Sequence, residues 1–428
     1  MTTPPPEGRA SWRHLFVSEV PHEPLDEESR RRYALPRTML PSPEGLRQLP
    51  VFDPALKQFA NAYRSGDPAF ADDAARLAWH RARRTALDLV LAGLADGPWA
   101  EHLVLRGSVL MATWFGGAAR DPGDLDLVVT PAAWTMDGPE TAGLFDDVAR
   151  DAEAASLAHG GVRIDASGRV TEDIWTYERV PGRRMLLPWS APGTAGGTVQ
   201  LDVVFEERLP APPEYVTLRP LGDGPGATVL GVSPALSLAW KLLWLVTDRY
   251  PQGKDLYDAV LLAEHTPPVY GPVRDAFLAA GGEGLRPPGQ GWTRLDHGEG
   301  WRHFAADHPE HDGRSADFAA RLGRALGPLL AEAERPGDTT HDRWARWLEP
   351  LVHATCAEAA ADRAGALGRL AADGAEGLLA AVTVLRAIEG PGNLSPDEAT
   401  RALLDSDERW EHWRKYPRVC ATVLARLA

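Results

Sequence analysis

The sequence is poor in cysteine and contains no long apolar run. Its two cysteines, Cys356 and Cys420, exclude a disulfide framework and a cysteine-rich metal site. No uninterrupted apolar segment approaches the ~18 residues that a membrane helix needs, and the first residues lack the basic and apolar regions of a signal peptide. We therefore expect a cytoplasmic protein with no membrane partner.

Excess positive charge is also missing. The chain has 428 residues, which predicts two or three domains, and its net charge is −15. Residues 1–100 hold 13 basic and 13 acidic side chains, so the whole acidic excess lies in 101–428. An acidic protein is not a general polyanion binder. A nucleic-acid partner would need a local basic patch, for which Arg30 to Arg32 and Arg81 to Arg84 are candidates; solvated helix faces are the alternative.

Lysine is rare among the basic residues. Only four of the 45 are lysines, at positions 57, 241, 254 and 415. Because lysine is so scarce, the occurrence of Lys241 and Lys254 within one short segment is informative.

The pattern along the chain predicts an α/β (α+β) fold with a mixed sheet. A helix is expected over 69–96, followed by a strand at 102–105, a helix at 109–115 and a strand at 125–129. A further helix at 139–158 and antiparallel strands within 162–205 follow, and the pattern is helical from 233 onward. The predicted divisions are an N-terminal, partly extended arm (1–74), a catalytic domain (75–232), a helical domain (233–336) and a helical appendage of unknown role (337–428).

Three acidic residues lie in segments that are otherwise apolar. Asp124 and Asp126 are two apart on one predicted strand, so their side chains share a face. Asp202 has the same setting within the strand at 199–205. Neighbouring carboxylates resist ionising together unless a cation lies between them. Three of them on adjacent strands predict a site for Mg²⁺. We expect two ions there, which would clamp an in-line displacement at phosphorus.

Gly107 and Ser108 open the predicted helix that precedes these acids. A glycine-led turn lets backbone N–H groups approach a phosphate, and the helix N-terminus favours negative charge. Each signal alone is weak, because Gly-Ser opens many helices and Asp-x-Asp occurs in many surface turns. Their order on a strand–helix–strand pattern, with a third strand acid downstream, is much more specific.

The order of these pieces resembles the polymerase-β-like nucleotidyltransferase superfamily. Val104 to Ser108, Gly123 to Leu127 and Lys254 to Asp258 are similar to one branch of it, the AbiEii/AbiGii-type toxin nucleotidyltransferases of toxin–antitoxin and phage-defence systems. The resemblance covers roughly residues 75–335.

The resemblance implies a role for each matching residue. Gly107 and Ser108 would contact the nucleotide phosphates, and Asp124, Asp126 and Asp202 would hold Mg²⁺, with Asp202 acting on the attacking hydroxyl as ligand or base. A second set would meet the triphosphate or complete the catalytic motif: Lys241, Lys254, Asp255 and Asp258. Two positions depart from the family pattern, since Val109 replaces a small or hydroxylated residue and Lys254 stands where arginine is commoner.

The residues themselves leave alternatives open. Lys241, within an apolar helix, either extends to solvent or pairs with an anion, and Asp255 could simply favour the helix dipole. The glycines from 193 to 197 lack a P-loop lysine and predict a hairpin turn. The histidines 303, 308 and 311 are a poor metal site, because Pro309 breaks the helix that would align them.

The function expected from the resemblance is Mg²⁺-dependent transfer of a nucleoside monophosphate from an NTP to a hydroxyl, in a cleft between the catalytic and helical domains. The leading acceptor is tRNA, with a cognate antitoxin as a further partner. The alternatives are transfer to a protein or small molecule, and an inactive fold that acts as a binding module.

Overall fold

A computed structural model describes residue 12 and residues 19–176, 180–248, 251–293, 298–359 and 362–427. The chain divides into two compact units, Met1–Ser233 and Pro234–Ala428. The further predicted divisions near residues 74 and 336 stay predictions.

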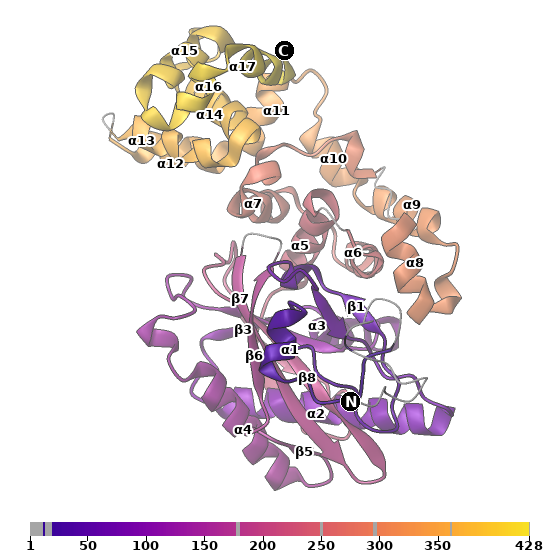
Figure 1. The fold of residues 1–428 in the computed structure, drawn as a ribbon. Coiled ribbons are helices and arrows are strands. Elements are labelled where there is room, and N and C mark those ends of the chain that lie inside the picture. Colours follow the sequence, from indigo (N-terminus) through magenta and orange to yellow (C-terminus); the bar gives the residue numbers. More distant parts are fainter. Residues whose placement is uncertain are drawn as a thin grey trace. The chain divides into compact units, whose positions relative to one another are not determined.

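The first unit is built on an eight-stranded mixed sheet (Figure 1). The strand order is β5-β7-β8-β4-β3-β10-β9, and β6 adds to β7 at one edge. The pairs β4–β8 and β3–β10 are parallel, and the other pairs are antiparallel. The strands are β3 (Leu103–Arg106), β4 (Asp124–Val129), β5 (Arg163–Ile164), β6 (Val170–Thr176), β7 (Val180–Ala191), β8 (Thr194–Val204), β9 (Glu214–Leu218) and β10 (Ala227–Gly231). The mixed sheet confirms the predicted fold class.

Helices cover one face of this sheet. The long helix α2 (Asp73–Asp96) begins at Asp72, whose carboxylate accepts from the backbone N–H of Ala75, and its apolar side is buried against β8, β10 and α4 (Leu144–His159). Trp79 of α2 contacts Trp189 of β7, with ring centroids 5.7 Å apart. Trp79 also lies next to Gly197 of β8. Side chains alternate along a strand, so Leu201, four residues after Gly197, is buried beneath α2, whereas Asp202 faces the other side of the sheet.

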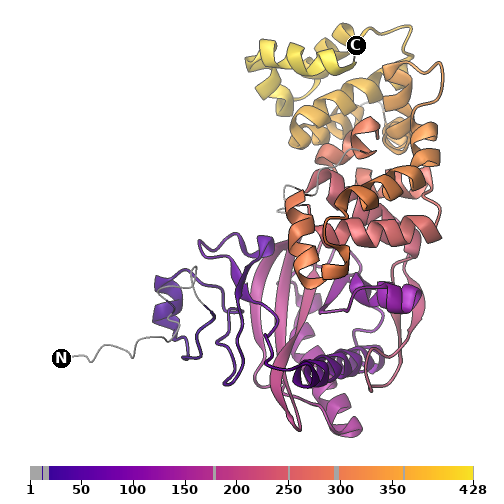
Figure 2. The same cartoon turned by 90° about the vertical axis from the view of Figure 1, so that its right-hand side faces the viewer.

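The N-terminal segment packs on the other side of the sheet from α2 and α4 (Figure 2). It contains α1 (Glu27–Arg32), β1 (Pro50–Phe52), the 3₁₀ turn η2 (Pro54–Leu56) and β2 (Tyr63–Ser65). The expected arm was partly extended; the segment contains the short strands β1 and β2 and also has local structure of its own. Asp26 caps α1, and a small buried cluster of Trp12, Val20, Leu35 and Met39 gives the segment a core of its own.

The sheet contains more strands than the pattern predicted. The longest, β7, was not identified, because Pro181, Arg183, Arg184 and Pro188 obscure its alternation. The strands β9 and β10 were missed as well. The predicted hairpin lies between β7 and β8, where Gly193 has φ +74° at the turn.

The second unit is helical throughout its described residues. Its helices are α5 (Pro234–Thr247), α6 (Gly253–His265), α7 (Tyr270–Ala280), α8 (Gly298–Asp307), α9 (Ser315–Ala325), α10 (Gly327–Ala333), α11 (Thr340–Trp347), α12 (Glu349–Ala357), α13 (Arg363–Arg369), α14 (Gly374–Glu389), α15 (Pro396–Ser406), α16 (Glu411–Lys415) and α17 (Pro417–Leu424). Within the described ranges, none of the helices in the chain is both long and apolar enough to cross a bilayer.

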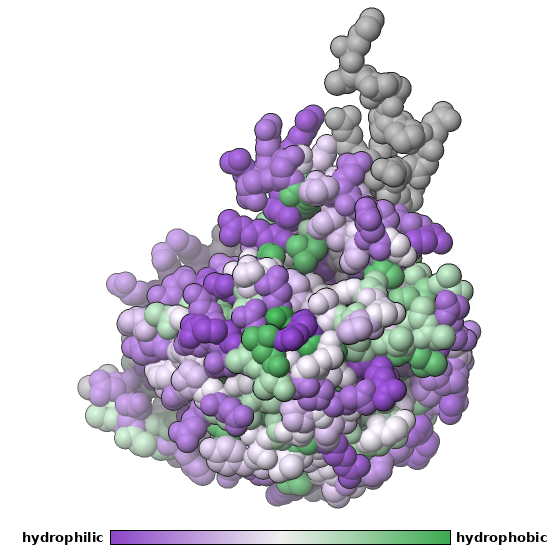
Figure 3. Space-filling view, turned by 90° about the horizontal axis from the view of Figure 1, so that it is seen from below, coloured by the Kyte–Doolittle hydropathy of each residue, from purple (hydrophilic) through white to green (hydrophobic). Residues whose placement is uncertain are grey.

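The face viewed in Figure 3 mixes hydrophilic and hydrophobic side chains. Purple hydrophilic residues are interspersed with smaller green hydrophobic groups. This mixture is ordinary for a protein surface in water.

Candidate active site

A row of charged residues crosses five adjacent strands of the sheet. The strand registers pair Glu172 of β6 with Arg184 of β7, Arg184 with Asp202 of β8, Asp202 with Asp126 of β4, and Asp126 with Arg106 of β3. Cross-strand partners point to the same face. The sheet therefore places Asp126 and Asp202 side by side on the face opposite α2, which confirms the predicted adjacency of their strands.

Gly107 joins this row to the helix α3 (Ser108–Phe115). Its φ of +83° and ψ of −147° are open to glycine and strained for other residues. A Cβ at this position would also lie 2.5 Å from Oδ2 of Asp126. Two independent constraints thus require glycine here, and they bring the start of α3 directly against the Asp126 carboxylate.

Ser108 begins α3 with a buried hydroxyl. The residue is 1% exposed, and its Oγ has no hydrogen-bond partner among the described residues. No side chain caps the first turn of α3. Because an unsatisfied buried polar group costs free energy, and because a helix N-terminus attracts anions, this turn has the chemistry to bind a phosphate.

Asp124 and Asp126 lie on the same face of β4 and are both half-buried. Mg²⁺ in nucleotide enzymes is commonly held by one or two carboxylates together with substrate phosphates. This pair of oxygen donors, next to the first turn of α3, fits that pattern. Within the described residues, no group of three or more His, Cys, Asp or Glu side chains is arranged to hold a metal.

Asp202, the proposed third ligand, is engaged elsewhere. Its Oδ1 and Oδ2 accept hydrogen bonds from Nε and Nη2 of Arg184, both at 2.7 Å, and Nη1 of Arg184 donates to Oδ2 of Asp53 at 2.6 Å. Arg184 is 3% exposed. Metal ligation by Asp202 stays a prediction, and it would require Asp202 to share its oxygens with Arg184.

Burial and charge oppose each other in this cluster. Burial alone would raise the pKa of Asp53, but Arg184 and Arg64 outweigh it, so the pKa lies below its ordinary value. Burial alone would lower the pKa of Arg184, yet Asp202 and Asp53 raise it well above the ordinary value. Asp53 and Arg184 therefore form a charged pair, and Arg184 also holds Asp202 in an Asp53–Arg184–Asp202 cluster.

Arg106, at the other end of the row, is also buried. It is 4% exposed and donates from Nη1 to Oε2 of Glu207 at 2.7 Å. Its charge is thus satisfied within the sheet unit, and it borders Asp126 through the strand register.

The remaining predicted residues form a cluster in the helical unit. Nζ of Lys241, on α5, lies 2.7 Å from Oδ1 of Asp255 and 3.0 Å from Oδ2 of Asp258, both on α6. All three are buried, and Lys241 also lies 4.9 Å from the ring centre of Trp244. Of the two alternatives for Lys241, pairing with an anion is confirmed, and the anions are carboxylates of its own unit. Contact with a triphosphate stays a prediction, as does the cleft between the domains.

Lys254 and the histidines make no comparable site. Lys254 is half-buried and makes no ion pair with any described residue. His308 and His311 lie near Glu310 and pack with aromatic rings such as Phe304. Among the described residues, these histidines belong to no group of three or more potential metal ligands.

Sequence reasoning missed Asp53, Arg184 and Glu207. Asp53 lies in the segment that was expected to be extended, and Arg184 lies on the strand that was not identified. The one available signal was that Arg184 directly precedes a continuous apolar run, Met185 to Trp189, which is similar to the apolar setting that identified Asp202.

One family model matches the chain. The family is described as the nucleotidyl transferase AbiEii toxin of a type IV toxin–antitoxin system, and the match covers residues 89–343. No curated protein gives a match. The matched range holds every predicted site residue, from Gly107 to Asp258, and leaves out the segment that carries Asp53.

Proposed function

Because the chain belongs to the AbiEii family of nucleotidyl transferase toxins, we propose that it transfers a nucleoside monophosphate from an NTP to a hydroxyl of RNA, with tRNA as the leading acceptor. The family makes the chain a transferase enzyme of a type IV toxin–antitoxin system, which implies a nucleotide substrate and an antitoxin. The magnesium requirement and the RNA acceptor are parts of the proposal.

One observation carries the proposal. Gly107 lets the first turn of α3 approach Asp126, and the unpartnered hydroxyl of Ser108 lies in that same turn. A donor for phosphate oxygens and a carboxylate for a cation are thus adjacent, as phosphoryl transfer requires.

Each predicted site residue of the first unit then has a role. Asp124 and Asp126 would hold Mg²⁺, which when bound supplies charge neutralisation for the transferring phosphate. Ser108 and the N–H groups of the first turn of α3 orient the triphosphate. Asp202 would accept the proton of the attacking hydroxyl or share in cation binding, while Arg184 fixes its orientation.

The helical unit would contribute through Lys241, Asp255, Asp258 and Lys254. We propose that Lys254, which has no acidic partner among the described residues, meets the triphosphate, and that Lys241 does so while it stays anchored to Asp255. Asp258 is 0% exposed, which favours a supporting role within the cluster.

The test uses the full chain, Mg²⁺, total tRNA and each NTP labelled at the α-phosphate. The expected result is label on RNA. Label on the protein would favour protein nucleotidylation, and label on neither would favour a binding module. Asp126→Ala is expected to abolish the transfer without unfolding the chain, and undiminished transfer by that variant would remove the site assignment.

A further inference from the structure

We propose that a cavity between the N-terminal segment and strand β6 binds the phosphate backbone of the acceptor RNA strand. The cavity has a volume of about 580 Å³ and lies wholly within the first unit. This proposal rests on the proposed function, because it adds a binding site for the RNA that is proposed there as the acceptor. Eleven residues line it: Glu27, Arg30, Arg31, Ala34, Leu35, Arg37, Phe59, Thr171, Glu172, Asp173 and Arg183.

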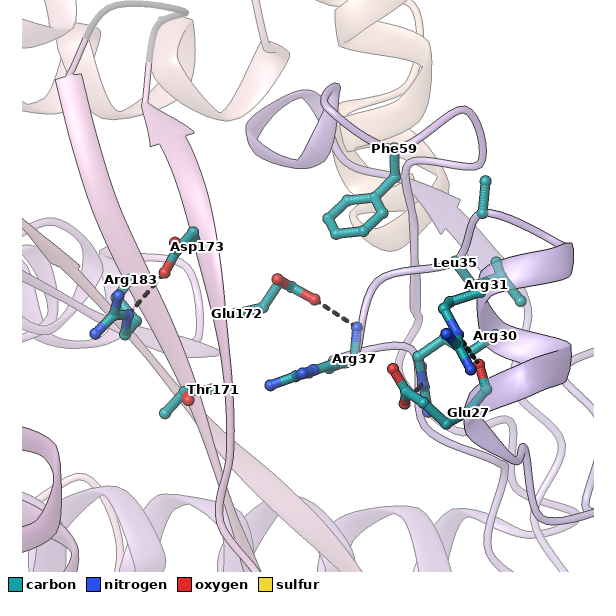
Figure 4. A pocket seen from close by; sticks show the side chains of 11 residues that line it. Glu27, Arg30, Arg31, Leu35, Arg37, Phe59, Thr171, Glu172, Asp173 and Arg183 are labelled. Atoms are coloured by element: carbon teal, nitrogen blue, oxygen red, sulfur yellow. Dashed lines mark hydrogen bonds and ion pairs between the residues drawn. The ribbon is translucent and has the colours of Figure 1, made fainter.

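The acidic residues of the cavity are largely occupied by protein contacts. Oε2 of Glu172 accepts the backbone N–H of Arg37 at 2.6 Å, and Oδ1 of Asp173 accepts from Nε of Arg183 at 2.7 Å (Figure 4). Arg183 also donates to Asp137. The two carboxylates of β6 thus each already accept a hydrogen bond from the protein.

Two arginines of the cavity, in contrast, have guanidinium groups with no acidic partner among the described residues. Arg31 and Arg37 are exposed, and neither makes an ion pair with any residue in the described ranges. Figure 4 shows the side chain of Arg37 extending into the space between α1 and β6. Arg30 is different, since its guanidinium donates to the carbonyls of Pro36 and Met39 and supports the loop. Nε of Arg31 donates to the backbone carbonyl of Glu27 at 3.3 Å. The Nη groups of Arg31 and the guanidinium of Arg37 are thus left as donors among the described residues, and their planar shape suits phosphate.

An aromatic ring completes the site. Phe59 is half-buried, packs on the cluster of Leu56, Ala62 and Ile174, and forms part of the cavity wall. An aromatic ring beside cationic donors is the arrangement by which proteins bind single-stranded nucleic acid, because the ring stacks on a base while arginines contact the backbone.

The position of the cavity fits an acceptor strand. Glu172 begins the charged row that leads through Arg184 and Asp202 to Asp126. Three strand spacings of ~4.8 Å separate Glu172 from Asp126, or ~14 Å, which about four stacked nucleotides span at ~3.4 Å each. A strand held at the cavity could therefore present its end at the carboxylates. The net acidic charge of the chain does not oppose this, since residues 1–100 are electrically neutral.

The test measures binding of a fluorescein-labelled single-stranded RNA to the full chain by anisotropy, over a series of salt concentrations. The Arg31→Ala/Arg37→Ala variant is expected to weaken RNA binding about tenfold and to reduce the salt slope by about 1.4, the loss of two phosphate contacts. Affinity for NTP should stay unchanged. The charge-matched control is Arg163→Ala/Arg418→Ala, two exposed arginines that do not line the cavity, and it should bind RNA as the unaltered chain does.

A second variant tests the same site with the opposite sign. Glu172→Gln keeps an acceptor for the N–H of Arg37 but removes a negative charge, so RNA binding should tighten. The inference is overturned if the Arg31/Arg37 variant matches the unaltered chain, if its control loses as much affinity, or if an acidic peptide or inorganic phosphate competes as well as RNA does. RNA that binds but is never labelled would overturn the proposed function and leave the cavity assignment standing.

Discussion

At the residue scale, the site depends on close approach and on an unsatisfied hydroxyl. Gly107 meets Asp126 at a distance that no side chain allows, and Ser108 buries an oxygen with no described partner. Neither feature stabilises the fold by itself, and the proposed function gives each a use in binding a phosphate. Two predictions follow from this difference between stability and binding.

Gly107→Ala should abolish most activity and destabilise the chain. The positive-φ, extended backbone of Gly107 costs of order 1–3 kcal/mol for alanine, and the contact with Asp126 adds to this. Gly117→Ala is the matched control, because a Cβ there meets nothing within 4 Å, and it should change stability by no more than ~0.5 kcal/mol. Urea unfolding and NTP transfer measure both effects; a Gly107 variant as stable and active as the control would contradict the geometry.

Ser108→Ala should separate binding from stability. Its hydroxyl makes no hydrogen bond within the described structure, so its removal should leave the free energy of unfolding unchanged or slightly raised. Loss of a bond to a charged phosphate should weaken NTP binding by ~1.5–3 kcal/mol, about tenfold or more. Ser156→Ala is the contrasting control, because Oγ of Ser156 donates to Glu153 and accepts from Ile164. It should destabilise the chain and leave NTP affinity intact; the reverse pattern would refute the role of Ser108.

At the scale of elements, buried ion clusters tie segments together. Arg184 of β7 joins Asp202 of β8 to Asp53, which directly precedes η2. Lys241 likewise joins α5 to α6. A buried ion pair adds little net stability when intact, but removal of one partner leaves a costly charge.

Asp53→Asn should change how stability depends on pH. The pKa of Asp53 is lowered in the folded chain, so its contribution is fully present above the ordinary pKa of ~3.9 and is lost as the pH falls through the lower, folded value. The variant should be less stable at neutral pH by roughly 1–3 kcal/mol and should lose less on acidification. Urea unfolding at several pH values measures this, with Glu101→Gln, an exposed acid, as control. An unchanged pH profile would show that the Asp53–Arg184 pair contributes nothing.

Lys241→Met should destabilise the helical unit by about 3–5 kcal/mol, because Asp255 and Asp258 would stay buried without a cation. The triple variant Lys241→Met/Asp255→Asn/Asp258→Asn should recover much of that loss, since it removes the unpaired charges. Thermal unfolding of the two variants decides the question. Equal stability of the single and triple variants would contradict the assignment of this cluster as a closed ionic unit.

The sequence predicted the elements whose patterns are local and regular. The helix α2, the strand β4 and the turn at Gly107 follow from apolar spacing and from glycine. The strand β7 could not be predicted in the same way, because its arginines are explained by partners elsewhere along the chain: Arg184 by Asp53 and Asp202, and Arg183 by Asp137.

The site was predictable to the same extent. The three acids could be identified because a carboxylate in an apolar strand needs a cation. That argument uses only the local sequence and not the neighbouring strands. It named a metal ion, but the structure also supplies a protein cation, Arg184, for one of the three. Which cation an acid meets depends on the strand order and on the N-terminal segment, and neither is encoded in local spacing.

At the scale of the whole molecule, the first unit holds Asp124, Asp126, Asp202 and the turn proposed to bind phosphate, and the second holds Lys241 and Lys254. The sheet brings Asp126 and Asp202 together from positions 76 residues apart, through the parallel pairing of β4 with β8. The segment before the matched family range adds Asp53 and the arginines of the cavity. This segment, which lies before the matched range, and the strands that carry Asp126 and Asp202 therefore belong to the same unit.

The most direct test of the central claim is the rate of NTP-dependent transfer by Asp126→Asn beside Asp146→Asn, an exposed acid of α4 that pairs with Arg169. Both variants should fold, as circular dichroism and urea unfolding would show. Asp126→Asn should lose about 10²–10³-fold or more in rate, and Asp146→Asn should transfer as the unaltered chain does. Equal rates for the two variants would contradict the account.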